Sequence, residues 1–194
     1  MADAALLLTP GAGADRDQPA LVAIEDALDI PVERMDFPYR KAGRRAPDRP
    51  PVLLDAVRHG AAALAERTGL PPDRLLLGGR SMGGRICSMA VAEGLPALGL
   101  VLVSYPLHPP GKPDRLRIEH FEAVDVPCLF VSGTRDAFGT PEELVQHAQA
   151  IAGPVTLAWV DGGDHGLRRR DAEVANVVAA WVGELVAGYR LAKE

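Results

Sequence analysis

Short aliphatic runs alternate along this chain with longer stretches whose apolar residues recur every three or four positions. The runs are apolar on both faces, as expected of parallel strands that helices cover on two sides. The last long stretch has an apolar stripe from Val174 to Val186 that matches one face of a helix. The predicted strands are residues 6–8, 32–37, 74–77, 98–103, 128–132 and 155–160.

Strands that alternate with helices are typical of an α/β fold around a mostly parallel sheet, with helices on both faces. In such a sheet the loops after the strands gather at the carboxyl edge, where ligands bind. Helix ends carry their own signals: Thr140 and Glu143 are spaced for a capping box, and Asp171 is a candidate N-cap. The predicted helices are residues 19–28, 53–69, 82–93, 140–151 and 174–186, and residues 38–51 and 105–126 are predicted as loops at the carboxyl edge.

The composition excludes several classes of protein. A length of 194 residues predicts a single domain over residues 1–194. The net charge of −5 is not that of a protein that binds nucleic acid or an anionic membrane. The two cysteines, Cys87 and Cys128, suit neither a disulfide framework nor a structural metal site, and no apolar run spans a membrane. We expect a cytoplasmic protein without a metal ion; its oligomeric state stays open.

The most specific motif is Gly79-Arg80-Ser81-Met82-Gly83, between a predicted strand and a predicted helix. A serine at such a sharp strand-to-helix turn has its hydroxyl above the sheet, and the flanking glycines let strand and helix approach each other. The pattern alone is common by chance, but in this context it indicates a nucleophilic serine at Ser81.

A nucleophilic serine requires a base and an acid that orients the base. After such a turn they follow in the chain order acid, then histidine, each after a later strand. Asp136 and His165 occupy these places, so we predict a triad of Ser81, Asp136 and His165. Asp161 and Asp164 are alternatives for the acid; Asp164 adjoins the histidine and should point away, and Asp161 is better explained as a turn former. Three other histidines, His59, His120 and His147, are interpreted as surface residues.

Acyl transfer also requires donors for the developing oxyanion. One is predicted to be the backbone N–H of Met82, and the other an amide of the glycine-rich loop after the first strand, with Ala12 favoured and Gly13 next. A dinucleotide site is the alternative for this loop, but the third glycine of that fingerprint is absent. No cofactor is therefore expected.

Substrate contacts are predicted from placement at the same edge. His108 follows the fourth predicted strand and is a candidate for lining the pocket, as are Arg80 beside the nucleophile and Arg45 in the loop after the second strand. Several cations thus gather near the predicted site: Arg44, Arg45, Arg49, Arg80, Arg85 and Lys112. They either pair with surface carboxylates or favour substrates that carry carboxylate or phosphate.

Taken together, these motifs resemble the α/β-hydrolase superfamily over nearly the whole chain. The chain is similar to small, lid-less bacterial hydrolases related to dienelactone hydrolases, and to the testis-expressed and KAT8-complex hydrolase-like group. The resemblance rests on residues 7–14, 36–39, 43–47, 79–85 and 105–112 and on the loops of Asp136 and His165.

The resemblance implies a minimal α/β-hydrolase fold without a lid, with six strands in the order 2-1-3-4-5-6. It implies a serine hydrolase that cleaves a small ester, thioester or lactone. Dienelactone hydrolases use a cysteine nucleophile, however, and Pro10 stands where many superfamily members have histidine. The alternative from another class is a non-catalytic hydrolase-like module that binds a partner or serves as a scaffold.

Overall fold

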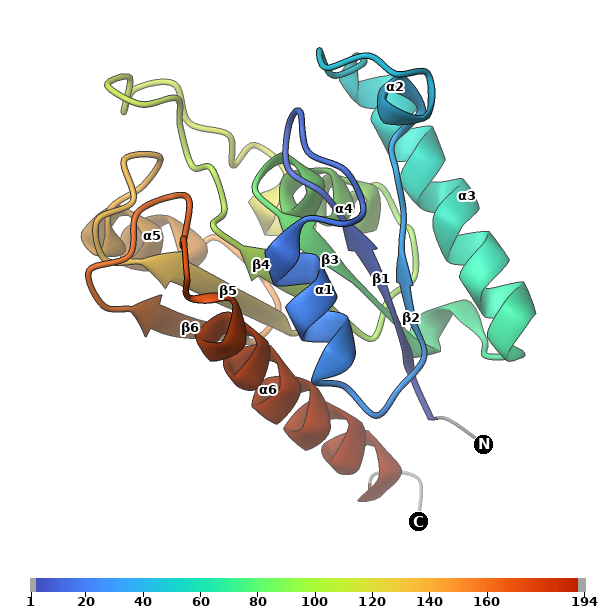
Figure 1. Cartoon of the computed structure of the whole chain (residues 1–194). Coiled ribbons are helices and arrows are strands. Elements are labelled where there is room, and N and C mark those ends of the chain that lie inside the picture. Colours follow the sequence, from blue (N-terminus) through green and yellow to red (C-terminus); the bar gives the residue numbers. More distant parts are fainter. Residues whose placement is uncertain (1–2, 192–194) are drawn as a thin grey trace.

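A computed structural model describes residues 3–191, and its centre is one parallel sheet (Figure 1). The sheet has six strands in the order β2-β1-β3-β4-β5-β6, and every neighbouring pair is parallel. This confirms the predicted fold class and strand order. The strands are β1 (Ala5–Thr9), β2 (Val32–Arg34), β3 (Leu75–Arg80), β4 (Gly99–Val103), β5 (Cys128–Gly133) and β6 (Val155–Val160).

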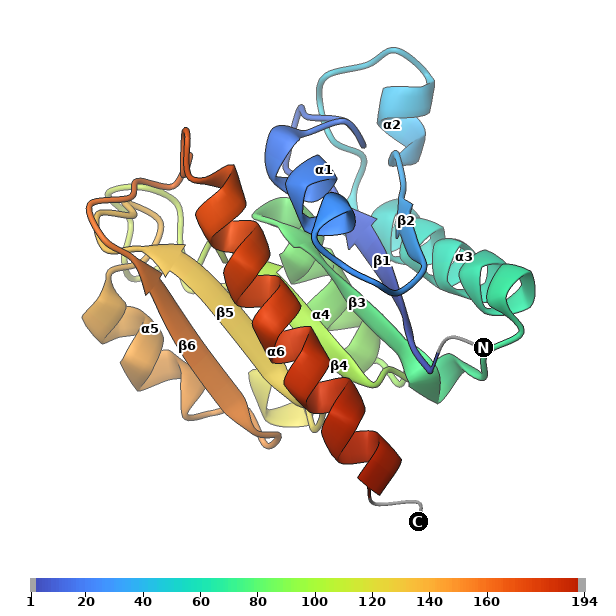
Figure 2. The ribbon, with the colours of Figure 1, turned by 60° about the horizontal axis from the view of Figure 1, so that its bottom comes forward.

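Helices cover both faces of the sheet (Figure 2). Two of them, α1 (Pro19–Asp26) and α6 (Asp171–Leu191), pack side by side on one face. The opposite face is covered by α3 (Pro50–Thr68), α4 (Met82–Ala92) and α5 (Pro141–Ala148), while the short α2 (Pro38–Lys41) precedes α3. Among the helices of residues 3–191, none has both the length and the apolar character to cross a bilayer.

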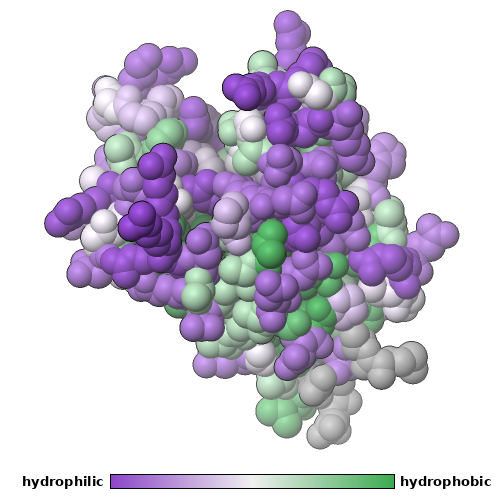
Figure 3. Space-filling model, in the orientation of Figure 1, coloured by the Kyte–Doolittle hydropathy of each residue, from purple (hydrophilic) through white to green (hydrophobic). Residues whose placement is uncertain are grey.

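The core consists of two apolar layers, one on each face of the sheet. Along β1 and β3, Leu7 and Leu77 point into the layer under α3 and α4, and Leu6 and Leu76 into the layer under α1 and α6. This accounts for strands that are apolar on both faces. The face of Figure 3 is largely hydrophilic, and its hydrophobic side chains gather low, over α1 and α6.

Two predicted helix signals are confirmed and one is displaced. Thr140 and Glu143 form the reciprocal capping box at the start of α5. Gly69 ends α3 in the left-handed conformation, with φ 69°. Asp171, predicted as the N-cap of the last helix, is instead its first helical residue. The difference is one residue at a helix end, where acidic side chains are favourable on either side of the boundary.

The two predicted loops differ in outcome. The connection from β4 to β5 has no α-helix, only the 3-10 turn Phe121–Ala123, which agrees with the loop predicted at residues 105–126. Residues 38–51 are not wholly irregular, because α2 and the first residues of α3 lie there. Strand β3 also continues beyond the predicted residue 77: a β-carbon on Gly78 would lie 2.3 Å from the carbonyl oxygen of Val101, so glycine is what lets β3 and β4 pair there.

Candidate active site

Ser81 stands at a strained turn between β3 and α4. Its backbone has φ 51° and ψ −117°, a conformation that side-chain-bearing residues rarely adopt. The end of β4 holds this turn in place, because the N–H of Ser81 donates to the carbonyl oxygen of Val103 at 2.8 Å. The two flanking glycines are required by close approach: a β-carbon would lie 2.1 Å from the carbonyl oxygen of Thr9 at Gly79, and 2.5 Å at Gly83. These contacts are the physical basis of the glycines in the motif.

We expect Gly83→Ala to lower the free energy of unfolding by about 3 kcal/mol, because the methyl group meets the β1 backbone rather than a flexible side chain. Gly183→Ala is the matched control, because Gly183 lies within α6 and nothing lies within 4 Å of an added β-carbon. Its free energy of unfolding should rise by about 1 kcal/mol, since alanine has the higher helix propensity. Denaturant unfolding of the two variants measures both effects. Equal unfolding free energies would show that the packing at Gly83 is loose.

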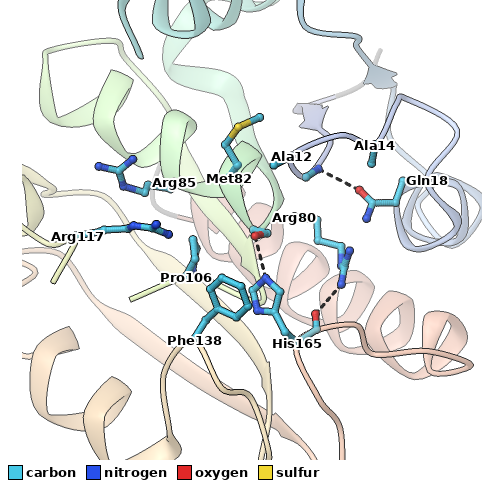
Figure 4. A pocket seen from close by; sticks show the side chains of 12 residues that line it. Ala12, Ala14, Gln18, Arg80, Met82, Arg85, Pro106, Arg117, Phe138 and His165 are labelled. Carbon is cyan, nitrogen blue, oxygen red and sulfur yellow. Dashed lines mark hydrogen bonds between the residues drawn. The ribbon is translucent and has the colours of Figure 1, made fainter. Parts of the chain in front are cut away.

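His165 and Asp136 complete a hydrogen-bonded chain with Ser81 (Figure 4 shows the serine–histidine contact). The Nε2 atom of His165, on the loop after β6, lies 2.9 Å from the Ser81 hydroxyl. Its Nδ1 atom lies 2.8 Å from one carboxylate oxygen of Asp136 and 3.0 Å from the other. Asp136 follows β5 and is 3% exposed. The sequence-predicted residues therefore meet at the carboxyl edge, although they are far apart in the chain.

Phe138 and the Asp136 backbone turn hold this arrangement in place. The N–H of Phe138 donates to Asp136 Oδ1 at 2.8 Å, and its ring stacks on the imidazole of His165 with 3.9 Å between ring centroids. A carboxylate at Nδ1 favours the tautomer with the proton on that nitrogen, which leaves Nε2 free to accept a proton from Ser81. The arrangement can thus raise the nucleophilicity of the serine hydroxyl.

The competing acids lie elsewhere. Asp161 accepts a hydrogen bond from the Thr134 hydroxyl at 3.3 Å, which agrees with a turn-forming role. Asp164 makes no hydrogen bond to His165 among the described residues. The thiols are equally unsuited as nucleophiles, because burial raises the pKa of Cys87 and of Cys128 to about 12.

The candidate oxyanion donors differ in availability. Ala12 and Met82 line the cavity beside Ser81, and Met82 is the first residue of α4, where unpaired amides and the helix dipole favour negative charge. Within residues 3–191 no hydrogen bond engages the N–H of either one. The Gly13 N–H, by contrast, donates to the Tyr39 hydroxyl at 3.1 Å, and Gly13 does not line the cavity. The geometry therefore favours Ala12 and Met82 and takes Gly13 out of the pair.

The cavity at Ser81 has a volume of about 490 Å³ and combines apolar and cationic walls. This size suits a small-molecule ligand. Three arginines reach it from different elements: Arg80 from the end of β3, Arg85 from the first turn of α4, and Arg117 from the long loop after β4. The other lining residues are Gly11, Ala12, Ala14, Gln18, Ser81, Met82, Pro106, Phe138 and His165 (Figure 4).

Of the three predicted substrate-binding residues, only Arg80 lines this cavity. Its guanidinium donates to the carbonyl oxygen of His165 and so braces the histidine loop. His108 is 5% exposed and contacts the Glu143 carboxylate at 3.3 Å instead, so it is a packed residue beneath the edge. Arg45 is exposed in the loop before α3 and does not reach the cavity. Arg117 lines the cavity without being among the predicted residues, and its only sequence signal is a basic residue in a segment predicted as an edge loop.

His120 is not the surface residue expected from the sequence. It is partly buried, and its Nε2 atom lies 2.8 Å from the hydroxyl of Ser88 in α4. Burial, and next the charge of Arg85, lowers the pKa of His120 from 6.5 to about 4. The imidazole is therefore neutral at pH 7 and belongs to the structural layer beneath the site.

This depressed pKa makes stability depend on pH. Between about pH 6.5 and 4 the unfolded chain binds a proton at His120 more readily than the folded chain, so stability falls as the pH falls through this window. In His120→Gln, whose amide can still donate to Ser88, the loss of unfolding free energy between pH 7 and pH 4 should be smaller by about 2 to 3 kcal/mol. Denaturant unfolding at both pH values measures it. The same loss in both proteins would exclude His120 as the cause.

Comparison with known proteins agrees with this architecture. The sequence model of the family described as "Alpha/beta hydrolase domain" matches residues 2–182, which is nearly the whole chain. The chain belongs to the α/β-hydrolase family. The narrower likeness to the testis-expressed and KAT8-complex group stays a prediction.

Solved structures with the same fold are distant in sequence from this α/β hydrolase. An α/β serine hydrolase homologue from Coxiella burnetii has a TM-score of 0.75 at 16% identity, over 92% of this chain and 84% of that one. An esterase domain from Rhodothermus marinus has a TM-score of 0.73 at 18% identity, over 96% and 89%. A dienelactone hydrolase from Anabaena variabilis has a TM-score of 0.72 at 18% identity, over 94% and 87%. These structures establish the fold of this α/β hydrolase and leave its substrate open.

Proposed function

We propose that this α/β hydrolase is a serine hydrolase that cleaves a small ester, thioester or lactone through an acyl-enzyme at Ser81. The observation that carries the proposal is the continuous hydrogen-bonded chain Ser81–His165–Asp136 on a strained elbow at the mouth of a cavity. A nucleophile, a base in contact with it and an acid that orients the base are the geometric requirements for this chemistry.

In the proposed first half-reaction, the Ser81 hydroxyl attacks the substrate carbonyl carbon while His165 Nε2 takes its proton. The carbonyl oxygen becomes an oxyanion and accepts hydrogen bonds from the N–H groups of Met82 and Ala12. When the intermediate collapses, the bond to the leaving group breaks and the imidazolium donates its proton to that group. The acyl group is left on Ser81 as an ester.

In the second half-reaction, a water molecule takes the place of the Ser81 hydroxyl as the nucleophile. His165 removes a proton from the water, whose oxygen attacks the acyl carbon, and then returns a proton to the Ser81 oxygen as the acid product leaves. Asp136 accepts the hydrogen bond from His165 Nδ1 and stabilises the imidazolium in both halves. The reaction requires neither a metal ion nor an organic cofactor.

The competing interpretation, a non-catalytic binding or scaffold module, gives no physical reason for the strained serine. A binding module could replace Ser81 by glycine and lose the backbone strain, and it would not need a buried carboxylate on the histidine. The complete chain of hydrogen bonds favours the hydrolase.

An activity screen across aryl esters, thioesters and lactones of increasing acyl length tests the proposal. A cavity of about 490 Å³ predicts turnover of short acyl groups and a decline for long ones. The Ser81→Ala protein, purified in the same way, accounts for contaminating hydrolases. No turnover above that control for any member of the panel would contradict the proposal.

A further inference from the structure

Two arginines define one wall of the cavity, and neither forms an ion pair within residues 3–191. Arg85 and Arg117 lie on one side together with Pro106, and Ala12, Ala14 and Gln18 lie on the opposite side (Figure 4). No carboxylate of residues 3–191 forms an ion pair with either guanidinium. The arginines that do form such pairs are Arg34, Arg40, Arg44, Arg58, Arg67 and Arg170.

The two cations are also partly stripped of water. The Nε atom of Arg85 is buried and has no hydrogen-bond partner among the described residues. Burial lowers the pKa of Arg117, and the nearby charge of Arg85 lowers it further. Glu119 is the one carboxylate whose charge acts on Arg117, and it forms no ion pair with either arginine among the described residues. Two like charges held close together are unfavourable, and a bound anion would relieve both the repulsion and the missing hydrogen bond.

Both side chains start from backbone that is held firmly relative to the nucleophile. The N–H of Arg85 donates to the carbonyl oxygen of Ser81 at 3.1 Å in the first turn of α4. The loop backbone at Arg117 is fixed on both sides, because its N–H donates to the Leu107 carbonyl oxygen at 2.8 Å and its own carbonyl accepts from the Tyr105 hydroxyl at 2.7 Å. The cationic wall is therefore built into the fold rather than carried on a free loop.

From this arrangement we infer that Arg85 and Arg117 bind an oxyanion group of the substrate, so that the enzyme acts on acyl compounds that carry a carboxylate or a phosphate. Planar guanidinium groups bind both anions with paired hydrogen bonds. The inference rests on the proposed hydrolase function, because it names the substrate class of the same cavity. It also replaces Arg45, which is exposed and does not line the cavity, as the candidate for recognising charge.

A pair of aryl esters of equal length tests the inference. One acyl chain ends in a free carboxylate and the other in the corresponding primary amide, which has the same size and no charge. The wild-type kcat/KM should be higher for the carboxylate ester by about tenfold or more, which corresponds to the free energy of one hydrogen bond to a charged group. The ratio of the two kcat/KM values should fall as salt is added. In Arg117→Gln the ratio should fall to near one, and in Arg117→Lys it should be intermediate.

The matched control is Arg115→Gln, which removes an exposed cation two residues away that does not line the cavity. It should keep the wild-type ratio, because general surface charge is not the cause. A wild-type preference for the neutral ester, or a carboxylate preference that Arg117→Gln leaves unchanged, would overturn the inference.

Calorimetric titration of the Ser81→Ala protein separates anion binding from chemistry. Inorganic phosphate and glutarate are titrated in turn. The ligand with the lower dissociation constant shows whether the site prefers phosphate or carboxylate. Binding should weaken by about tenfold when Arg117→Gln is added. If neither anion binds, the inference fails even where ester hydrolysis is found. If an anion binds through Arg117 but the wild-type protein hydrolyses no ester, the proposed function fails and the anion site stands.

Discussion

Replacing Ser81 by alanine should lower kcat/KM for any ester that the wild-type protein hydrolyses by about 10⁴-fold or more. Among the described residues, the Ser81 hydroxyl is the only group within hydrogen-bond distance of His165 Nε2. The variant therefore has no nucleophile that could form an acyl-enzyme. What turnover remains would come from water in the oxyanion site. The effect is measured by steady-state kinetics on the best substrate of the acyl panel.

The same substitution should leave thermal stability unchanged or raise it. Ser81 is held at φ 51°, and its hydroxyl serves the histidine rather than the fold. Ser88→Ala, in the helix α4 that follows Ser81, is the matched control. Ser88 is 1% exposed, and its hydroxyl donates to the Arg85 carbonyl oxygen and contacts His120. That variant should lose about 1 kcal/mol of stability while it keeps hydrolysis. Near wild-type turnover in Ser81→Ala would remove Ser81 from the mechanism.

The second large effect is expected at Asp136. Asn preserves the size of the side chain but can present an amide N–H to His165 Nδ1, which favours the wrong tautomer and leaves Nε2 protonated. We expect kcat to fall by about 10⁴-fold. His165→Ala should have a comparable effect, because it removes the base itself.

The three substitutions should be far from additive. Asp136→Asn or His165→Ala in the Ser81→Ala background should cost little more, since the three groups act as one unit. Single-turnover and steady-state rates of the double variants measure this. Independent, multiplying losses would show that Asp136 or His165 acts through the fold rather than through Ser81.

The sheet and the elbow could be predicted from the sequence because both are local. Strands buried on two faces must be apolar throughout, and the capping box at Thr140 and Glu143 depends only on residues three apart. Gly79 and Gly83 are recognisable from their spacing around Ser81, although the reason for them is a long-range contact: the close approach of β1 admits no side chain at either position. Asp136 and His165 could be predicted from their position after a strand, since parallel strands end at a common edge.

Other parts depend on contacts between distant segments and could not be read from the chain. The loop after β4 has no periodic pattern, so nothing in it indicated that Arg117 would reach the cavity whereas His108 would pack under Glu143. The burial of His120 likewise results from α4 and its Ser88, which lies 32 positions away. In each case the local sequence permits several orientations, and the packing of another element selects one.

The most direct test of the central claim is labelling with a fluorophosphonate, which reacts only with an activated serine. Intact mass and peptide mapping should show one adduct per chain, located on Ser81. Ser81→Ala should show none, and His165→Ala should label far more slowly, because Nε2 no longer takes the hydroxyl proton. A folded wild-type chain that is never labelled, or an adduct on a residue other than Ser81, would contradict the account.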